Sequence, residues 1–100
     1  MNEKRFFEDA VEEICTRLAE TLISKQRDYG GKSLLDFGEL GVLVRANDKM
    51  SRLKNLLGNS LEPKNEVIED SWMDLAGYSV LALLLRSNQM ELPMKNVENE

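Results

Sequence analysis

The sequence contains no histidine and a single cysteine, Cys15. The absence of histidine excludes Ser-His-Asp and Cys-His catalysis and every zinc site that uses imidazole. One cysteine excludes a disulfide within the chain and fits a reducing compartment. Chemistry must therefore come from carboxylates, Lys, Arg, Tyr or Ser.

Long apolar runs and alternating patterns are also missing. The longest apolar run, 80–85, is far too short to span a membrane. The charged N-terminus is not typical of a signal peptide. No segment alternates with the two-residue period of a strand over a useful length. We therefore expect an all-α, cytoplasmic protein with no membrane partner.

The composition that is present is that of a small globular protein. With 100 residues, 42% of them apolar and 31% charged, the chain fits one soluble domain. Its net charge of −5 argues against broad binding to duplex nucleic acid. Because the core of so short a chain is small, self-association is expected.

Apolar residues recurring every three or four positions predict three helices. Glycines and Pro63 mark the breaks between them. The predicted helices cover about 4–26, 36–57 and 65–88. Residues 1–90 are expected to form a single helical domain, and 91–100 a flexible tail.

The third predicted helix has no polar face over residues 80–85, so this half must be covered on all sides. Two other helices from one short chain offer too little cover. We therefore expect a bundle of three main helices completed by a dimer or a higher homo-oligomer.

A stripe of mixed charge follows the second predicted helix. Four residues cluster within roughly a third of its circumference. They are Arg45, Asp48, Lys49 and Arg52. Either this stripe is a solvated outer face, or it lines a cleft with cations and an acid.

The third predicted helix carries Glu66, Asp70 and Asp74 within an arc of about 80°. Carboxylates that approach one another raise each other's pKa, and burying them costs desolvation energy. Mg²⁺ or Mn²⁺ would relieve both costs. The alternative is that the first two favour the positive end of the helix dipole while Asp74 pairs with an arginine.

Three segments together resemble a known family. The segments are KQRDYG at 25–30, GVLVRANDKMSRLKNLL at 41–57 and EVIEDSWMDLAGYSVLALL at 66–84. They resemble the phage and bacterial nucleotide modification associated domain family. That family is similar to the all-α nucleoside triphosphate pyrophosphatases of the MazG and dimeric dUTPase type.

The resemblance implies roles for particular residues. It places metal binding at Glu66, Asp70 and Asp74, and acid or base catalysis at Asp48 and Glu66. It makes Arg45, Lys49 and Arg52 candidate phosphate ligands, and Tyr29 a ring that could meet a base. The pyrophosphatases carry Glu-x-x-Glu on one helix and Glu-x-x-Asp on the next. Here Glu66 and Glu69 give the Glu-x-x-Glu spacing, but on the third predicted helix. The second predicted helix offers only Asp48, in its stripe of mixed charge.

These observations lead to three hypotheses. The first is a Mg²⁺-dependent pyrophosphohydrolase that acts on a nucleoside triphosphate, a deoxynucleotide by preference, in the nucleotide metabolism of a phage or its bacterial host. The second is a phage protein that binds or sequesters a nucleotide without catalysis. The third is a small helical interaction protein in which the charged residues only form salt bridges.

Overall fold

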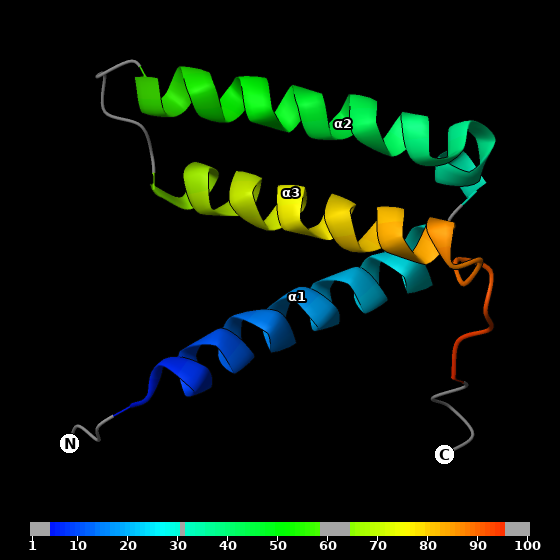
Figure 1. Ribbon diagram of the computed structural model, residues 1–100, viewed down its shortest axis with the longest axis horizontal. Helices are drawn as coiled ribbons and strands as arrows, with labels where there is room; N and C mark the ends of the chain where they lie inside the picture. The colour runs from blue at the N-terminus through cyan, green and yellow to red at the C-terminus, as the bar shows by residue number, and fades with distance from the viewer. Residues whose placement is uncertain (1–4, 31, 59–64, 96–100) are drawn as a thin grey trace. The chain divides into compact units, whose positions relative to one another are not determined.

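The protein is described by a computed structural model, which covers residues 5–30, 32–58 and 65–95 and, within these, no side chain at 29, 32–36, 65 or 66. Its three helices are α1 (Phe7–Tyr29), α2 (Lys32–Gly58) and α3 (Asn65–Arg86) (Figure 1). The covered residues contain no strand. The all-α prediction is therefore confirmed. None of the helices, as far as they are described, is long and apolar enough to cross a membrane.

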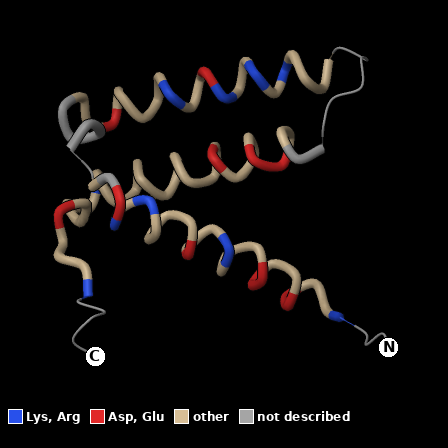
Figure 2. Tube along the Cα trace, turned by 180° about the vertical axis from the view of Figure 1, so that it is seen from behind, with Lys and Arg blue, Asp and Glu red and all other residues tan. Residues whose placement is uncertain are grey.

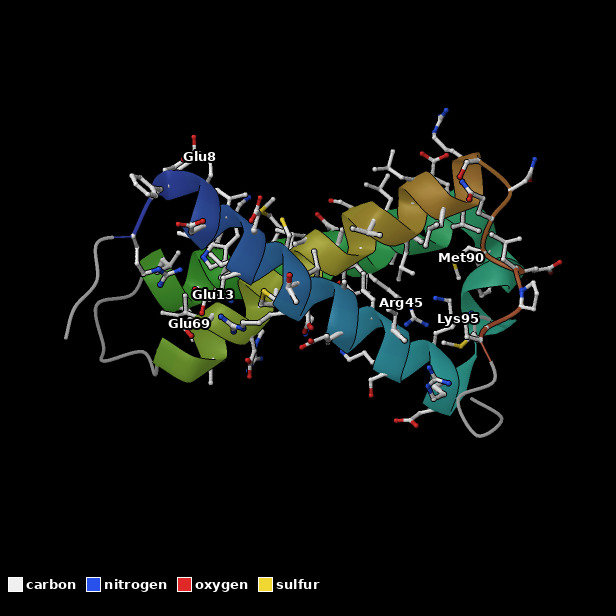
Figure 3. All side chains as sticks on the ribbon, turned by 90° about the horizontal axis from the view of Figure 1, so that it is seen from below. Glu8, Glu13, Arg45, Glu69, Met90 and Lys95 are labelled. Atoms are coloured by element: carbon white, nitrogen blue, oxygen red, sulfur yellow. The ribbon has the colours of Figure 1, made fainter. Side chains whose placement is uncertain are left out.

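The chain forms two compact units, residues 1–30 and 31–100. The first unit contains α1. The second contains α2, α3 and the segment after α3, in which Met90 is buried (Figure 3).

Helix α1 is amphipathic, as its apolar spacing predicts. At its start, the backbone N–H of Phe6 donates to Oδ2 of Asp9 at 3.3 Å. At its end, Gly30 has a φ of 70°, and its N–H donates to the carbonyl oxygen of Gln26 at 2.9 Å. Helix α1 therefore extends three residues past its predicted end near residue 26, and it ends just before Gly30. Tyr29, which the predicted boundary places beyond the helix, lies in its last turn.

Several apolar side chains on α1 are exposed, including Phe7 at 80% and Ile14 at 53%. In proteins, most of the stability of an amphipathic helix comes from the packing of its apolar face, not from helix propensity. This face must gain its stability by packing against another surface.

Helix α2 begins at Lys32, about one turn before the predicted start, and it bends at Gly38. Gly38 has φ 59° and ψ −147°, a backbone conformation that is almost restricted to glycine. The bend brings the chain close to itself, because a Cβ at Gly41 would lie 2.6 Å from Cβ of Phe37. Glycine at 38 and at 41 is what allows one continuous run of sequence to turn this corner.

Replacing Gly38 by alanine should lower the free energy of unfolding by about 1–3 kcal/mol, because a side chain strains this φ and ψ. Thermal unfolding followed by circular dichroism measures the change. Gly58→Ala is the matched control, since Gly58 ends the same helix and nothing lies within 4 Å of an added Cβ. Equal melting temperatures for the two variants would show that the bend is not needed for stability.

Helices α2 and α3 pack side by side as an antiparallel hairpin (Figure 1). Val42 and Leu53 of α2 are each only 3% exposed, and on α3 Ser71 is 2% exposed. The hairpin therefore has a narrow core, and large apolar side chains remain exposed on both of its helices.

Candidate functional site

The candidate site is built around an ion pair between α2 and α3. Nζ of Lys49 lies 2.8 Å from Oδ2 of Asp74. Both side chains are about three-quarters covered, with 29% and 27% of their surface exposed. The hydrogen bond to Asp74 raises the pKa of the Lys49 ammonium, although its partial burial acts in the opposite direction. The negative charge of Asp74 raises it further, and the positive charge of Arg52 lowers it.

Lys49 occupies a position that would ordinarily hold an apolar residue. Covered side chains on α2 follow one another at alternating intervals of four and three residues, the spacing of a helix contact. We call this line the inner seam; it consists of Val42, Ala46, Lys49, Leu53 and Leu56. A well-packed apolar pair at this level would be as stable as an ion pair, or more stable. The charges at Lys49 and Asp74 therefore need an explanation other than stability.

Further cations lie on α2 on either side of Lys49. Arg45 and Arg52 are exposed, one turn before and one turn after it. Figure 2 shows the positively charged residues of α2 running alongside the part of α3 that carries its acidic residues. The structure thus brings all three predicted phosphate ligands to one line of α2 beside α3.

The predicted acidic residues are only partly brought together. Asp70 is exposed on α3, one turn before Asp74. Asp48 is exposed on α2 and lies level with Asp74, because it is next to Lys49. The backbone of Glu66 lies in α3 about two turns before Asp74, roughly 12 Å along the helix axis. Asp48 and Glu66 are therefore well separated along the hairpin.

The side chains of two predicted site residues, Glu66 and Tyr29, fall outside the described part of the structure. The base contact predicted for Tyr29 and the third metal ligand predicted at Glu66 stay predictions.

Among the described side chains, no group of three Asp, Glu or Cys residues is arranged to hold a metal ion. Asp70 and Asp74 nevertheless supply two carboxylates one turn apart. Mg²⁺ in nucleotide sites is usually held by one or two carboxylates together with phosphate oxygens. The chemistry of these two residues fits such a site.

A second ion pair joins the helices near the bend. Nε of Arg86 donates to Oε2 of Glu39 at 3.0 Å. Both ion pairs fit one antiparallel register, with Glu39 level with Arg86 and Lys49 level with Asp74. The sequence analysis did not find this pair, because the register of a hairpin cannot be read from either helix alone.

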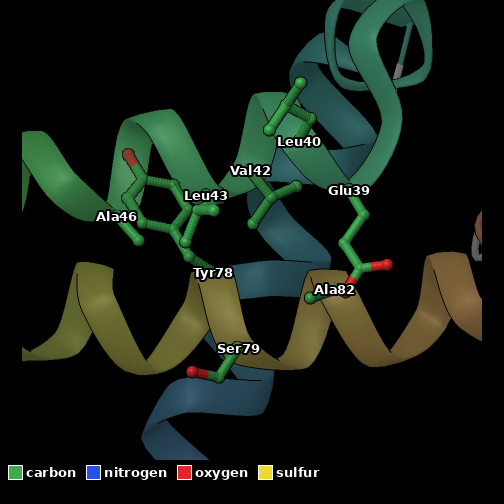
Figure 4. Close-up of a pocket in the computed structure, with 8 residues that line it drawn as sticks. All are labelled: Glu39, Leu40, Val42, Leu43, Ala46, Tyr78, Ser79 and Ala82. Carbon is green, nitrogen blue, oxygen red and sulfur yellow. The ribbon is translucent and has the colours of Figure 1, made fainter.

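An apolar pocket of about 430 Å³ lies in the groove between α2 and α3 (Figure 4). Tyr78 reaches across it from α3 towards α2, and Ser79 points away from α2. The hydroxyl of Ser79 instead donates to the carbonyl oxygen of Leu75. The pocket is lined by Glu39, Leu40, Val42, Leu43, Ala46, Tyr78, Ser79 and Ala82. The sequence analysis assigned no role to Tyr78, although it lies one turn after Asp74.

Comparison of the chain with protein-family models, with curated proteins and with solved structures finds no match in any of the three.

Proposed function

We propose that this chain binds a nucleoside triphosphate, a deoxynucleotide by preference, together with Mg²⁺ beside the Lys49–Asp74 pair and hydrolyses it to a monophosphate and pyrophosphate. The observation that carries the proposal is the ion pair itself, placed in the inner seam between further cations on α2 and Asp70 on α3. The three segments that resemble nucleotide-processing proteins contain all of these residues. The role would be in the nucleotide metabolism of a phage or bacterium, in the cytoplasm.

The cations of α2 would hold the phosphates. Arg45, Lys49 and Arg52 span about 10 Å along one side of the helix. Each guanidinium can bind two oxygens of one phosphate, and the ammonium acts as a compact charge between the two. When phosphate oxygens attract Lys49, the Lys49 ammonium competes less with a metal ion for the carboxylate of Asp74.

The carboxylates would act on the opposite side of the same ligand. Bound Mg²⁺ supplies polarisation of the phosphoryl oxygens and a site for an attacking water. Asp70 and Asp74 are the described residues that would hold it, with Glu66 as the third ligand implied by the resemblance. Asp48, exposed beside Lys49, is the described carboxylate that would accept the proton of the water.

A second function is favoured by the same ion pair. Because Lys49 already neutralises Asp74, the chain can bind a nucleotide through its cations without a metal and without catalysis. The two functions differ in a measurable way, since only the hydrolase needs a divalent cation and releases pyrophosphate. If neither nucleotide nor metal binds, the ion pairs are structural and the chain is a helical interaction protein.

The decisive experiment incubates purified protein with a panel of nucleoside and deoxynucleoside triphosphates, with Mg²⁺ or Mn²⁺, and separates the products by chromatography.

Arg52→Ala should weaken nucleotide binding by about 1.5–3 kcal/mol, the value of a lost charged hydrogen bond. Calorimetry measures this change.

Arg17→Ala is the matched control, because it removes the same charge from an exposed position on α1. If the parent, Arg52→Ala and Arg17→Ala bind nucleotide with equal affinity, Arg52 is not part of the site. Binding without any product would favour the non-catalytic function.

A further inference from the structure

A second line of apolar side chains follows α2 beside the line that packs against α3. Leu43, Met50 and Leu57 recur every seven residues, and Leu40 precedes the first by three. These four side chains are 62%, 42%, 56% and 69% exposed, in that order. With exposed Asn47 and Lys54 they alternate at intervals of three and four residues, and we call this line the outer seam: Leu40, Leu43, Asn47, Met50, Lys54 and Leu57.

The outer seam has the pattern of a coiled-coil contact. Apolar residues at alternating spacings of three and four form such a contact, and a single polar residue in the line fixes its register. The seam lies about a third of a turn around α2 from the inner seam. One helix can therefore pack against α3 along one line and against a different helix along the other.

We propose that the outer seam binds the outer seam of a second copy of this chain, with the two α2 helices antiparallel. A second copy brings an identical apolar line, so the contact is self-complementary, as in a two-fold symmetric dimer. Charge selects the orientation. Parallel helices would place Lys54 against its own copy, whereas antiparallel helices place it about one turn from Glu39 of the second copy.

In the antiparallel register, the second copy also reaches the groove between α2 and α3. When Leu40 lies level with Leu57 of the second copy, Leu43 lies level with its Lys54. Both Leu40 and Leu43 line the apolar pocket of about 430 Å³. Leu57 of the second copy then enters or covers this pocket, and the stem of its Lys54 lies along apolar surface with its charge at the rim.

The mass of the protein in solution tests the contact, and the measurement needs no nucleotide. Light scattering at tens of micromolar should give about twice the chain mass of 11.4 kDa. Leu43→Lys should weaken association on the order of a hundredfold or more, because it would bury a second ammonium level with Lys54 of the second copy. Asn55→Lys is the control, since it adds the same charge at an exposed position outside the seam.

A chain mass near 11.4 kDa in the parent overturns the proposal. An association that Leu43→Lys leaves unchanged, or that Asn55→Lys weakens equally, also overturns it. Because Leu43 is exposed in a single chain, circular dichroism should show unchanged helix content in both variants.

Disulfide trapping tests the orientation independently of mass, in a Cys15→Ser background. Antiparallel helices place Leu40→Cys next to Leu57→Cys of the second copy, and keep each position about 25 Å from its own copy. Mixing the two single variants under oxidation should therefore give a linked heterodimer, with neither variant linking to itself. Self-linking of either variant would show parallel helices and overturn the arrangement. No linking at all would overturn the contact.

Discussion

Asp74→Asn should abolish the stabilisation of the folded chain by Mg²⁺ or Mn²⁺. In the parent, a metal at a hundredfold excess over its Kd should stabilise the folded state by about 2.7 kcal/mol. For a chain of this size, that corresponds to a rise in Tm of roughly 10–20 °C. Asparagine keeps the size of the side chain but not its charge, so the variant should show no rise. Differential scanning calorimetry with and without metal measures the effect.

The ion pair provides the controls for this experiment. Asp74→Asn also leaves Lys49 without its carboxylate partner, so each variant must be compared with itself in the absence of metal. Glu69→Gln removes one exposed carboxylate from the same helix, outside the arc of the predicted ligands, and should keep the metal effect. Lys49→Met should bind metal more tightly than the parent, since the Lys49 ammonium then no longer competes for Asp74.

A parent protein that binds no divalent cation at millimolar concentration would show the metal proposal to be wrong. Nucleotide binding by the same protein would then favour the non-catalytic function. A metal effect that survives in Asp74→Asn but disappears in Glu69→Gln would move the site away from the Lys49–Asp74 pair.

Leu53→Ala should destabilise the chain by about 2–5 kcal/mol, the usual cost of deleting a buried leucine side chain in a packed core. Leu53 is 3% exposed and lies one turn from Lys49 in the inner seam. Because folded domains are stable by only about 5–15 kcal/mol, this loss is a large fraction of the total stability, and the urea midpoint should fall clearly. Urea unfolding followed by circular dichroism measures the loss.

A matched pair of valines on α2 controls for helix propensity. Val42 is 3% exposed and Val44 is 57% exposed, two residues apart on the same helix. Val42→Ala should destabilise the chain, and Val44→Ala should leave its stability nearly unchanged. Equal effects at the two positions would mean that the inner seam is not the face of α2 that packs against α3.

The positions of the helices follow from local sequence patterns. Apolar spacing and glycines placed α1, α2 and α3 to within about one turn, because these signals act within a few residues. The largest difference was the start of α2. The sequence analysis placed a helix start near Asp36, whereas α2 begins at Lys32 and bends at Gly38. Whether a helix bends at a glycine with positive φ depends on the contacts that the segments on both sides of the bend then make. The spacing of apolar residues along the sequence gives no information about these contacts.

The charges of the candidate site were also predicted, but not their pairing. The sequence analysis identified Lys49 and Asp74 as members of complementary stripes. It did not show that Lys49 shares the inner seam with Val42 and Leu53 while Arg45 and Arg52 remain exposed. Which of several charges in one arc becomes covered depends on the direction from which the neighbouring helix approaches.

The sequence by itself thus determined the all-α class, the three helices and the two sets of charge that can meet a phosphate or a metal. Only the tertiary structure decided the register of α2 against α3, and with it the Lys49–Asp74 and Glu39–Arg86 pairs and the exposure of Leu43 and Met50. The reason is physical. Helix formation depends on residues three or four positions apart, whereas register depends on how two whole surfaces fit together.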